Sequence, residues 1–320
     1  MKKVLVTGAD GFVGRHLCLR LAQSGWDVHA AVRAGKPHPE LGKHATIRPV
    51  ADITDEAAWN RLLPGSEVVI HLAARVHVIK ETAADAGAEY HRINTDGTTA
   101  LAHAAVIHGV KRFVYLSTVK VHGEHTVSTP FSETDEPAPH QPYPASKWAA
   151  ERALAEISTG TTMGMTILRP PLIYGPGVKG NFLRLINLIY RGIPLPLASV
   201  NNSRSFLYVG NLISAIESSI STPSPRAETF LISDGHDLST PQLIRKIAAA
   251  MGVRARLLRC PLPVLLALST MAGKGGEMKR MVESLSVDCS HIKMQLQWAP
   301  PFTLEQGLGD TMRWFLDTRK

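Results

Sequence analysis

The sequence predicts an α/β fold in which helices cover both faces of a doubly wound parallel sheet. The first half of the chain alternates apolar runs of strand length with stretches whose apolar residues recur at helical spacing. Strands separated by helical patterns of about 10–15 residues are typical of βαβ units and a parallel sheet. A glycine-rich turn, Gly8 to Gly14, follows the first apolar run and opens the first helical stretch. Together these features are typical of a Rossmann-type domain.

Each element is expected where an apolar run or a helical pattern lies between turn residues. The strands expected in the first half lie at residues 3–7, 26–32, 45–50, 67–72, 112–117 and 165–169. The helices expected there lie at 12–24, 86–108 and 142–158. Beyond residue 170, prolines separate shorter elements, namely strands at 204–209 and 229–233 and helices at 241–251 and 304–317.

The change in character near residue 170 predicts two domains. We expect a first domain over residues 1–170 and a smaller substrate-binding domain over residues 171–320. A strand near 228–233 is expected to return to the sheet of the first domain.

Composition excludes several classes of protein. The chain has 320 residues, a mass of 34.8 kDa and a formal net charge of +8. Its basic residues are scattered, whereas nucleic-acid-binding proteins cluster them, so no nucleic-acid partner is expected. Cys18, Cys260 and Cys289 are far apart, which argues against a zinc site or a disulfide framework and fits a cytoplasmic protein. The histidines lack the i, i+4 spacing of a zinc-binding helix, so no metal is expected.

Residues 261–273 (PLPVLLALSTMAG) form a strongly apolar stretch. A membrane span needs about 20 apolar residues, so this stretch is too short and stable membrane insertion is not expected. Pro263 suits the first turn of a helix. We expect a buried or interfacial helix here.

The turn from Gly8 to Gly14 places three glycines between the first strand and the first helix. Gly8 permits a tight turn, Gly11 lets the backbone approach a pyrophosphate, and Gly14 allows the helix to pack closely on the strand. The helix that follows presents free N–H groups and its positive dipole end to the anion. The pattern predicts a bound dinucleotide, with contacts from Gly8, Asp10, Gly11, Phe12 and Val13.

The end of the second strand indicates which dinucleotide is bound. A carboxylate there would hydrogen-bond the ribose 2′-hydroxyl and repel a 2′-phosphate. The strand ends instead at Arg33, whose guanidinium can pair with a 2′-phosphate. We therefore favour NADP over NAD as the cofactor. Asp52 and Ile53, which follow the third strand, are candidates for covering the adenine edge.

The glycine turn and the segment Tyr143-Pro-Ala-Ser-Lys147 together resemble the extended short-chain dehydrogenase/reductase family. The likeness continues through residues 169–176, 204–209 and 297–298. Within that family the chain is similar to nucleotide-sugar epimerases and ketoreductases. The resemblance implies a UDP-sugar substrate. It also implies a homodimer, because family members often pair through helices that include the one carrying Tyr143 and Lys147.

Tyr143 and Lys147 lie four residues apart, which places both on one face of a helix. An ammonium near the phenol, reinforced by the positive charge of an oxidised nicotinamide, is expected to lower the pKa of Tyr143. Tyr143 would exchange a proton with a sugar hydroxyl or carbonyl while hydride passes to or from the nicotinamide. Lys147 would also hold the nicotinamide ribose. Thr118 is expected to hydrogen-bond the reacting oxygen, with Ser117 as the alternative.

The resemblance implies further contacts. Those expected to touch the cofactor lie near the carboxyl ends of strands and in the long helix: Leu72, Ala73, Ala74, Asn94, Ser117, Pro170 and Ile173. Those expected to touch the nucleotide sugar include two arginines for the diphosphate, since an arginine fork binds phosphate oxygens bidentately. The substrate set comprises Arg75, His77, Thr118, Asn181, Phe182, Pro196, Leu197, Arg204 and Arg280.

Two enzymatic interpretations share this site. A 4-ketoreductase would use NADPH to reduce the C4 ketone of a UDP-4-keto-6-deoxy-N-acetylhexosamine, whereas a 4-epimerase would oxidise C4 of a UDP-hexose and return hydride to the other face. Val119 and Lys120 stand where sugar 4,6-dehydratases carry an Asp-Glu pair, so dehydration is not expected. Arg33 favours reduction. So does a resemblance, through residues 71–78, to 4-ketoreductases that form UDP-N-acetylquinovosamine for bacterial O-antigen, the outer part of lipopolysaccharide. A non-catalytic dinucleotide sensor is the interpretation from another class.

Overall fold

The computed structural model of the chain describes residues 1–35, 38–76, 85–222, 227–273 and 275–319. The predicted pocket residue His77 lies outside the described residues.

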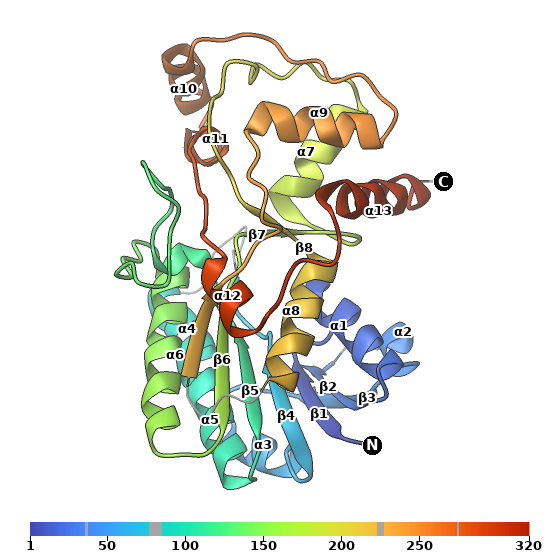
Figure 1. The fold of residues 1–320 in the computed structure, drawn as a ribbon, viewed down its shortest axis with the longest axis vertical. Helices are drawn as coiled ribbons and strands as arrows, with labels where there is room; N and C mark the ends of the chain where they lie inside the picture. The colour runs from blue at the N-terminus through green and yellow to red at the C-terminus, as the bar shows by residue number, and fades with distance from the viewer. Residues whose placement is uncertain (36–37, 77–84, 223–226, 274, 320) are drawn as a thin grey trace.

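Within the described residues, seven parallel strands form one sheet in the order β3-β2-β1-β4-β5-β6-β9 (Figure 1). The strands are β1 (Lys3–Thr7), β2 (Asp27–Arg33), β3 (Thr46–Val50), β4 (Ser66–His71), β5 (Arg112–Leu116), β6 (Gly164–Arg169) and β9 (Ala227–Leu231). The chain starts at β1 inside the sheet, builds one edge with β2 and β3, and returns past β1 to build the other half. The predicted Rossmann-type α/β fold is confirmed. The carboxyl ends of β1 and β4 mark its topological switch point, where such sheets bind ligands.

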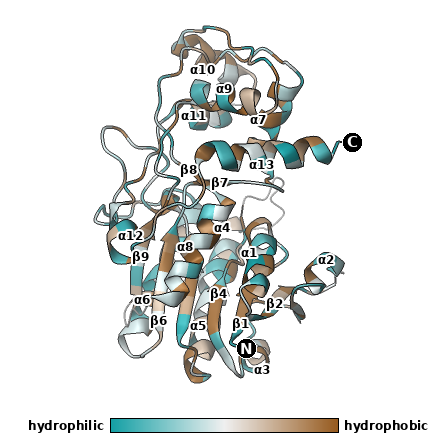
Figure 2. Ribbon diagram, turned by 45° about the vertical axis from the view of Figure 1, so that its right-hand side comes forward, coloured by the Kyte–Doolittle hydropathy of each residue, from teal (hydrophilic) through white to brown (hydrophobic). Residues whose placement is uncertain are grey.

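Successive residues of each strand point to opposite faces of the sheet. Val4 and Val6 therefore belong to the hydrophobic core on one face, and Leu5 to the core on the other. In β5, Val114 joins the first core and Phe113 the second. Because helices cover both faces, both sets of positions are apolar, and the strands read as continuous apolar runs in the sequence. Figure 2 shows these brown strands enclosed by helices.

The helices that cover one face are α3 (Glu56–Leu62), α5 (Gly97–Ile107) and α6 (Pro142–Thr159), and α4 (Ala86–His91) packs against α6. The other face carries α1 (Phe12–Gln23), α8 (Val209–Ser221) and α12 (Ser290–Gln295), while the short α2 (Pro39–Gly42) connects β2 to β3. The helix expected over residues 86–108 contains one irregularity, a π-helical turn at Arg92–Asp96 between α4 and α5. Single π-turns inside helices often occur at functional sites.

The smaller part of the molecule lies beyond the carboxyl ends of the strands (Figure 1). It contains a two-stranded parallel sheet, β7 (Leu172–Tyr174) and β8 (Phe206–Tyr208). Its helices are α7 (Gly180–Tyr190), α9 (Thr240–Ala250), α10 (Leu262–Met271), α11 (Gly275–Val282) and α13 (Leu304–Asp317). No helix in the described stretches of the chain has both the length and the apolar character that crossing a bilayer requires.

Three elements beyond residue 170, namely α8, β9 and α12, belong to the main sheet layer. The strand expected near 228–233 is β9, which pairs in parallel with β6, as predicted. Helix α8 packs against α1 and β5. The chain therefore enters the smaller part after β6 and returns to the sheet layer for α8 and β9. It leaves again for α9 to α11, returns for α12 and ends in the smaller part with α13.

Gly14 lies inside α1, where the helix crosses the glycine turn closely. A Cβ atom on Gly14 would lie 2.3 Å from the carbonyl oxygen of Gly8 and 2.7 Å from Cα of Ala9. These are backbone atoms, so they cannot move aside without shifting the turn. Gly309, inside α13, has no atom within 4 Å of the same position.

These two glycines make a matched pair for a stability experiment. Gly14→Ala is expected to lower the free energy of unfolding by about 1–3 kcal/mol, because the added methyl group overpacks the turn. Gly309→Ala is expected to raise it by up to about 1 kcal/mol, because alanine is the better helix former. Urea denaturation of both variants measures the difference. Equal stabilisation of the two variants would contradict the close packing at Gly14.

Candidate active site

The glycine turn and the end of β4 lie against each other at the switch point. Gly8 adopts a positive φ of 64°, which glycine tolerates best. A Cβ atom on Gly8 would lie 2.7 Å from the backbone nitrogen of Ala73. The Gly11 N–H donates to the Gly8 carbonyl at 3.0 Å, which closes the turn before α1 begins at Phe12. The turn thus brings backbone without side chains close to the N-terminus of α1. Free backbone N–H groups at such a place fit a pyrophosphate.

The segment after β6 lies beside both this turn and Thr118. The Val119 N–H donates to the carbonyl of Pro170 at 3.0 Å. On the other side, His16 Nε2 lies 2.7 Å from the carbonyl oxygen of Pro176. Ile173 lies in β7, opposite Leu207 of β8. The structure therefore brings together the predicted contacts at the glycine turn, at Thr118 and at Pro170.

A buried chain of hydrogen bonds joins the ends of β1 and β4 to the π-turn. The Thr98 hydroxyl donates to the Asn94 carbonyl at 2.6 Å, so its oxygen accepts from His71 Nε2 at 2.9 Å. His71 Nδ1 then accepts from the Thr7 hydroxyl at 2.6 Å, and Thr7 accepts from the Ala73 N–H at 3.2 Å. Burial, and next the charge on Lys147, lowers the pKa of His71 to about 3. The ring is therefore neutral at physiological pH, with its proton on Nε2.

Asn94 continues this chain toward the helix that carries Tyr143. Its Oδ1 accepts from the Arg75 N–H at 2.7 Å, and its Nδ2 donates to the Arg75 carbonyl at 3.0 Å and to Ser146 Oγ at 2.9 Å. Ser146 Oγ donates in turn to the Tyr143 carbonyl at 2.8 Å. The Thr95 hydroxyl donates to the carbonyl of Ser146. The π-turn thus holds the segment after β4 and the first turn of α6 at a fixed separation.

Tyr143 and Lys147 lie on α6, and the buried Lys147 Nζ stands 4.1 Å from the ring centroid of Tyr115. Burial lowers the pKa of Lys147 to about 7, although the nearby Glu151 carboxylate opposes this. Burial also raises the pKa of Tyr143 to about 12, and the neighbouring Tyr90 raises it further. The expectation that Lys147 and an oxidised nicotinamide together lower the pKa of Tyr143 stays a prediction, because in the chain by itself burial raises that pKa.

Ser117 belongs to a second buried network, behind the site. Its hydroxyl donates to Glu151 Oε1, and Glu151 forms an ion pair with Arg169, whose Nε donates at 3.0 Å to Oε2. Arg169 Nη1 lies 2.7 Å from His122 Nε2, and burial followed by the charge of Arg169 lowers the pKa of His122 to about 4. Ser117 is thus turned toward Glu151. Thr118 Oγ1 accepts from the Lys120 N–H at 3.3 Å, which favours Thr118 over Ser117 as the contact for the reacting oxygen.

The predicted adenine contacts lie near the end of β3. Arg33 is the exposed last residue of β2. Asp52 forms an ion pair with Arg92 of the π-turn at 3.0 Å. The Ile53 side chain packs on Gly97, where a Cβ atom would come within 2.7 Å of it, and its carbonyl accepts from the Trp59 indole. Asp52 and Ile53 therefore also tie this loop to the long helix.

Two of the predicted substrate residues, Arg75 and Arg204, have side chains with partners in the structure. Arg75 stacks over Tyr90 at 5.4 Å, and the Tyr90 ring packs edge-on against Tyr143, so this arginine lies beside the phenol. Arg204 Nη1 donates to the carbonyls of Arg280 and Glu283 at 2.6 and 2.9 Å, which anchors the segment after α11.

The remaining substrate candidates start α7 or follow it. Phe182 stacks on Tyr174 and Leu197 is buried, so both side chains belong to the hydrophobic core. Asn181 is exposed and Pro196 half-buried, and these two are better placed to meet a ligand.

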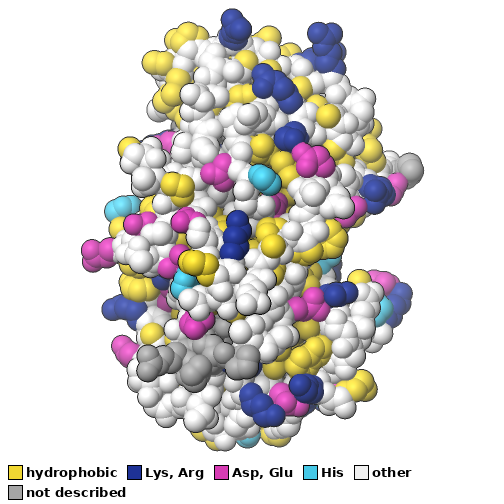
Figure 3. Space-filling view, viewed as in Figure 1, with side chains coloured by type: hydrophobic (Ala, Val, Ile, Leu, Met, Phe, Trp, Pro, Cys, Tyr) yellow, Lys and Arg dark blue, Asp and Glu magenta, His cyan; other side chains and the backbone are white. Residues whose placement is uncertain are grey.

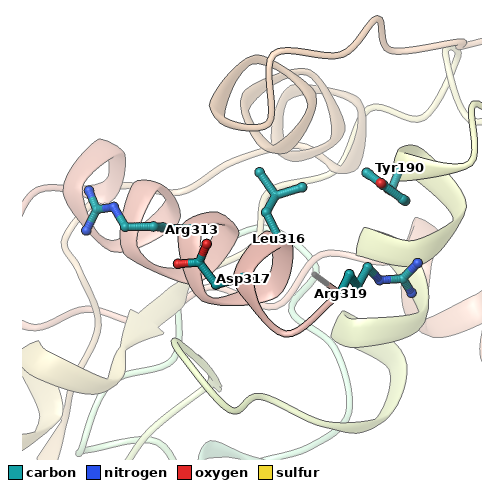
Figure 4. A pocket seen from close by; sticks show the side chains of 5 residues that line it. All are labelled: Tyr190, Arg313, Leu316, Asp317 and Arg319. Carbon is teal, nitrogen blue, oxygen red and sulfur yellow. The ribbon is translucent and has the colours of Figure 1, made fainter.

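A pocket elsewhere in the molecule lies away from all of these residues. It lies between the ends of α7 and α13 and is lined by Tyr190, Arg313, Leu316, Asp317 and Arg319 (Figure 4). None of the predicted site residues lines it. The described ranges of the chain contain no group of three or more histidine, cysteine, aspartate or glutamate side chains placed to hold a metal ion.

Sequence reasoning missed most of the supporting groups. His71 is the first residue of the segment 71–78 that resembles 4-ketoreductases, but nothing in the sequence shows that it bridges Thr7 and Thr98. Glu151 and Arg169 lie eighteen residues apart, on α6 and at the end of β6. One signal in the sequence could have indicated this ion pair. Glu151 lies one turn after Lys147 on the face of α6 that meets the sheet, and a buried carboxylate there needs a partner because an unpaired one would be costly.

These features define a class of protein: a Rossmann-type α/β fold with a glycine turn at the switch point of its sheet and a tyrosine–lysine pair on α6. The comparisons narrow the class. The model of the NAD dependent epimerase/dehydratase family matches residues 4–232, and the chain belongs to this family.

Similar proteins extend over nearly the whole chain. It is 38% identical over 318 residues to a UDP-glucose 4-epimerase of Vibrio cholerae, covering 98% of this chain and 96% of that protein. It is 27% identical to an N-acetyl-alpha-D-glucosaminyl-diphospho-ditrans,octacis-undecaprenol 4-epimerase of Escherichia coli O157:H7, covering 99% and 96%. A solved UDP-glucose 4-epimerase of Thermotoga maritima with UDP-glucose has a TM-score of 0.82 at 26% identity, covering 99% and 100%.

The buried ion pair of Glu151 and Arg169 makes a testable contribution to stability. Glu151→Gln is expected to lower the free energy of unfolding by about 3–5 kcal/mol, because the Arg169 guanidinium would stay buried without its counter-charge. Glu156→Gln, at an exposed position of the same helix, is the matched control and should change it by less than about 0.5 kcal/mol. Urea denaturation compares the two. A loss below 1 kcal/mol for Glu151→Gln would mean that Arg169 finds another partner.

Proposed function

We propose that the chain is a UDP-hexose 4-epimerase that inverts the configuration at C4 of the sugar with bound NAD. The observation that carries this proposal is the likeness to the Vibrio cholerae UDP-glucose 4-epimerase over 98% of the chain, together with the tyrosine–lysine pair on α6. A solved neighbour in complex with UDP-glucose and NAD, MoeE5, matches with a TM-score of 0.79 at 26% identity and supports the same ligand classes.

The dinucleotide, when bound, supplies the acceptor for hydride from C4 and the donor that returns it to the other face. The glycine turn would hold its pyrophosphate, and Lys147 its nicotinamide ribose. Tyr143 would remove the proton of the C4 hydroxyl as the ketone forms and return that proton in the second half of the cycle. Thr118 would donate a hydrogen bond to the same oxygen. Val119 and Lys120 offer no carboxylate for eliminating water, and Lys120 is paired with Glu124 at 2.8 Å.

The diphosphate of the substrate is assigned to Arg204, with Arg280 as the second candidate. Arg204 is anchored by the two carbonyls that it holds, so its position is fixed before a ligand arrives. We further propose a cytoplasmic homodimer, paired through the helix that carries Tyr143 and Lys147.

The role of Tyr143 is tested directly. Tyr143→Phe is expected to lower the rate of interconversion of UDP-glucose and UDP-galactose at least about a hundredfold, because only the proton-transferring oxygen is lost. Tyr190→Phe, a partly exposed tyrosine at the end of α7, is the control and should keep the rate. Chromatography of the two UDP-sugars measures the rates. A Tyr143→Phe rate within a few-fold of the original would remove Tyr143 from the mechanism.

A 4-ketoreductase that consumes NADPH is the second candidate, and Arg33 is the observation that favours it. The structure places this guanidinium at the end of β2, and a 2′-phosphate would accept its hydrogen bonds. Loss of NADPH absorbance with a 4-keto UDP-sugar, without interconversion of UDP-glucose and UDP-galactose, would assign this activity and support the O-antigen role.

Arg33 also yields a prediction on cofactor choice. Arg33→Asp is expected to weaken NADP binding at least about tenfold relative to NAD, because a carboxylate repels the 2′-phosphate and accepts from the 2′-hydroxyl. Arg191→Asp, at an exposed position after α7, serves as the control. Titration of each variant with both dinucleotides measures the ratio. An unchanged ratio would show that Arg33 does not meet the cofactor.

A further inference from the structure

Helix α10 is apolar around its whole circumference, yet most of it faces solvent. No charged residue lies between Leu262 and Met271, and of its side chains only Leu265 and Ser269 are buried. Val264 is 48% exposed, Leu268 58% and Met271 85%. These three recur at i, i+4 and i+7, so they form one continuous stripe on the helix. A helix that is apolar on all sides normally lies inside a protein. An exposed apolar stripe of this kind therefore indicates a surface that binds a partner.

The segment that contains α10 and α11 is strongly basic. Between Gly252 and Val282 the sequence carries six basic residues and one acidic residue, a net +5 out of the +8 of the whole chain. The acidic residue, Glu277, is paired with Arg184. Among the residues that the structure describes, no carboxylate lies within ion-pair distance of Arg254, Arg256 or Arg259. About a tenth of the chain therefore carries more than half of its net charge, beside its most exposed apolar helix.

The backbone of this segment holds the basic side chains outward. The Leu195 N–H donates to the Arg256 carbonyl and the Leu258 N–H to the Leu195 carbonyl, both at 2.8 Å. In an extended segment alternate residues share a side, so Arg254, Arg256 and Leu258 face out together while Leu257 faces inward. Leu258 is 55% exposed. We call these outward residues, with Arg259, the basic strip.

The strip and the stripe lie at the same end of the molecule. Figure 1 shows the chain running from α9 across the outer end of the smaller part to α10. At that end, Figure 3 shows hydrophobic side chains gathered where Figure 1 places α10, with lysine and arginine side chains above and beside them. In Figure 2, α10 is drawn largely in brown.

We propose that the apolar stripe of α10 and the basic strip form a surface that binds peripherally to an anionic lipid bilayer. Val264, Leu268 and Met271 would enter the boundary between headgroups and acyl chains, while the arginines face lipid phosphates. The helix is about 15 Å long, half of what spanning requires, so the protein lies on the bilayer.

The positive charge of the basic strip favours an anionic bilayer over a second copy of the protein as the partner of this surface. A two-fold interface would place the same patch against itself, so that two strongly positive surfaces would repel each other. A nucleic acid would meet the arginines but would leave the apolar stripe in water. An anionic bilayer satisfies both features at once.

Sedimentation of the full-length protein with lipid vesicles tests the proposal without reference to catalysis. The protein should bind vesicles of phosphatidylcholine that contain one third phosphatidylglycerol, and this binding should fall in molar salt. It should bind pure phosphatidylcholine vesicles weakly. Equal binding to both kinds of vesicle, or none to either, would overturn the proposal.

Variants separate the two features. Leu268→Glu with Met271→Glu should weaken binding at least about tenfold, because apolar contact is lost and the new charges repel the lipid. Arg254→Gln with Arg256→Gln should weaken it roughly fivefold per residue. The matched control is Met294→Glu, because Met294 on α12 is also a strongly exposed methionine. This variant should bind vesicles as the original protein does.

Two outcomes of these measurements would contradict the assignment. An equal loss in Met294→Glu would show that binding is not located at α10. Sedimentation velocity would reveal the other outcome, a concentration-dependent dimer that disappears in Leu268→Glu with Met271→Glu. That result would make the surface an interface between copies of the chain.

Discussion

The hydrogen-bond chain through His71 and Asn94 sets the distance on which the site depends. One end is Thr7, the last residue of β1, directly before the glycine turn. The other end is Ser146, whose hydroxyl donates to the Tyr143 carbonyl. The glycine turn and Tyr143 come from elements about 140 residues apart in the sequence. Each buried side chain in this series of hydrogen bonds, from Thr7 to Ser146, has its partner. A shift of either end would therefore leave a buried polar group without a hydrogen bond, at a cost of roughly 1–3 kcal/mol.

The sequence predicted those parts of the fold that depend on local pattern. Strand β1 and helix α13 could be placed because apolar spacing and end signals agree, as in the reciprocal bonds between Thr303 and Gln306 at the start of α13. The glycine turn could be interpreted because each glycine has a local steric reason. The π-turn at Arg92–Asp96 could not, because it is selected by contacts from α6 and from the end of β4, which no local pattern contains.

The candidate site divides in the same way. Tyr143 and Lys147 could be paired from their spacing, but the pKa of each depends on burial, which the sequence does not display. The pairing of Glu151 with Arg169 was invisible for a similar reason, since it joins α6 to β6 across the sheet edge. For the apolar stretch at 261–273, the sequence predicted the secondary structure but not the exposure to solvent. Its helix could be predicted, but its exposure is set by the paths of neighbouring segments.

Burial shifts three basic groups of the two buried networks and of α6 toward their neutral forms. His71 is neutral because its pKa is near 3, His122 because its pKa is near 4, and Lys147 is only partly charged at neutral pH because its pKa is about 7. The Tyr143 phenol, with a pKa raised to about 12, therefore keeps its proton in the chain alone. Under the proposed function, the positive charge of an oxidised nicotinamide would add to that of Arg75, whose guanidinium stacks over Tyr90 beside the phenol, and in a buried setting such charges act strongly. Tyr143 would then lose its proton more readily when a hydride acceptor is in place, which favours removal of the proton together with removal of the hydride.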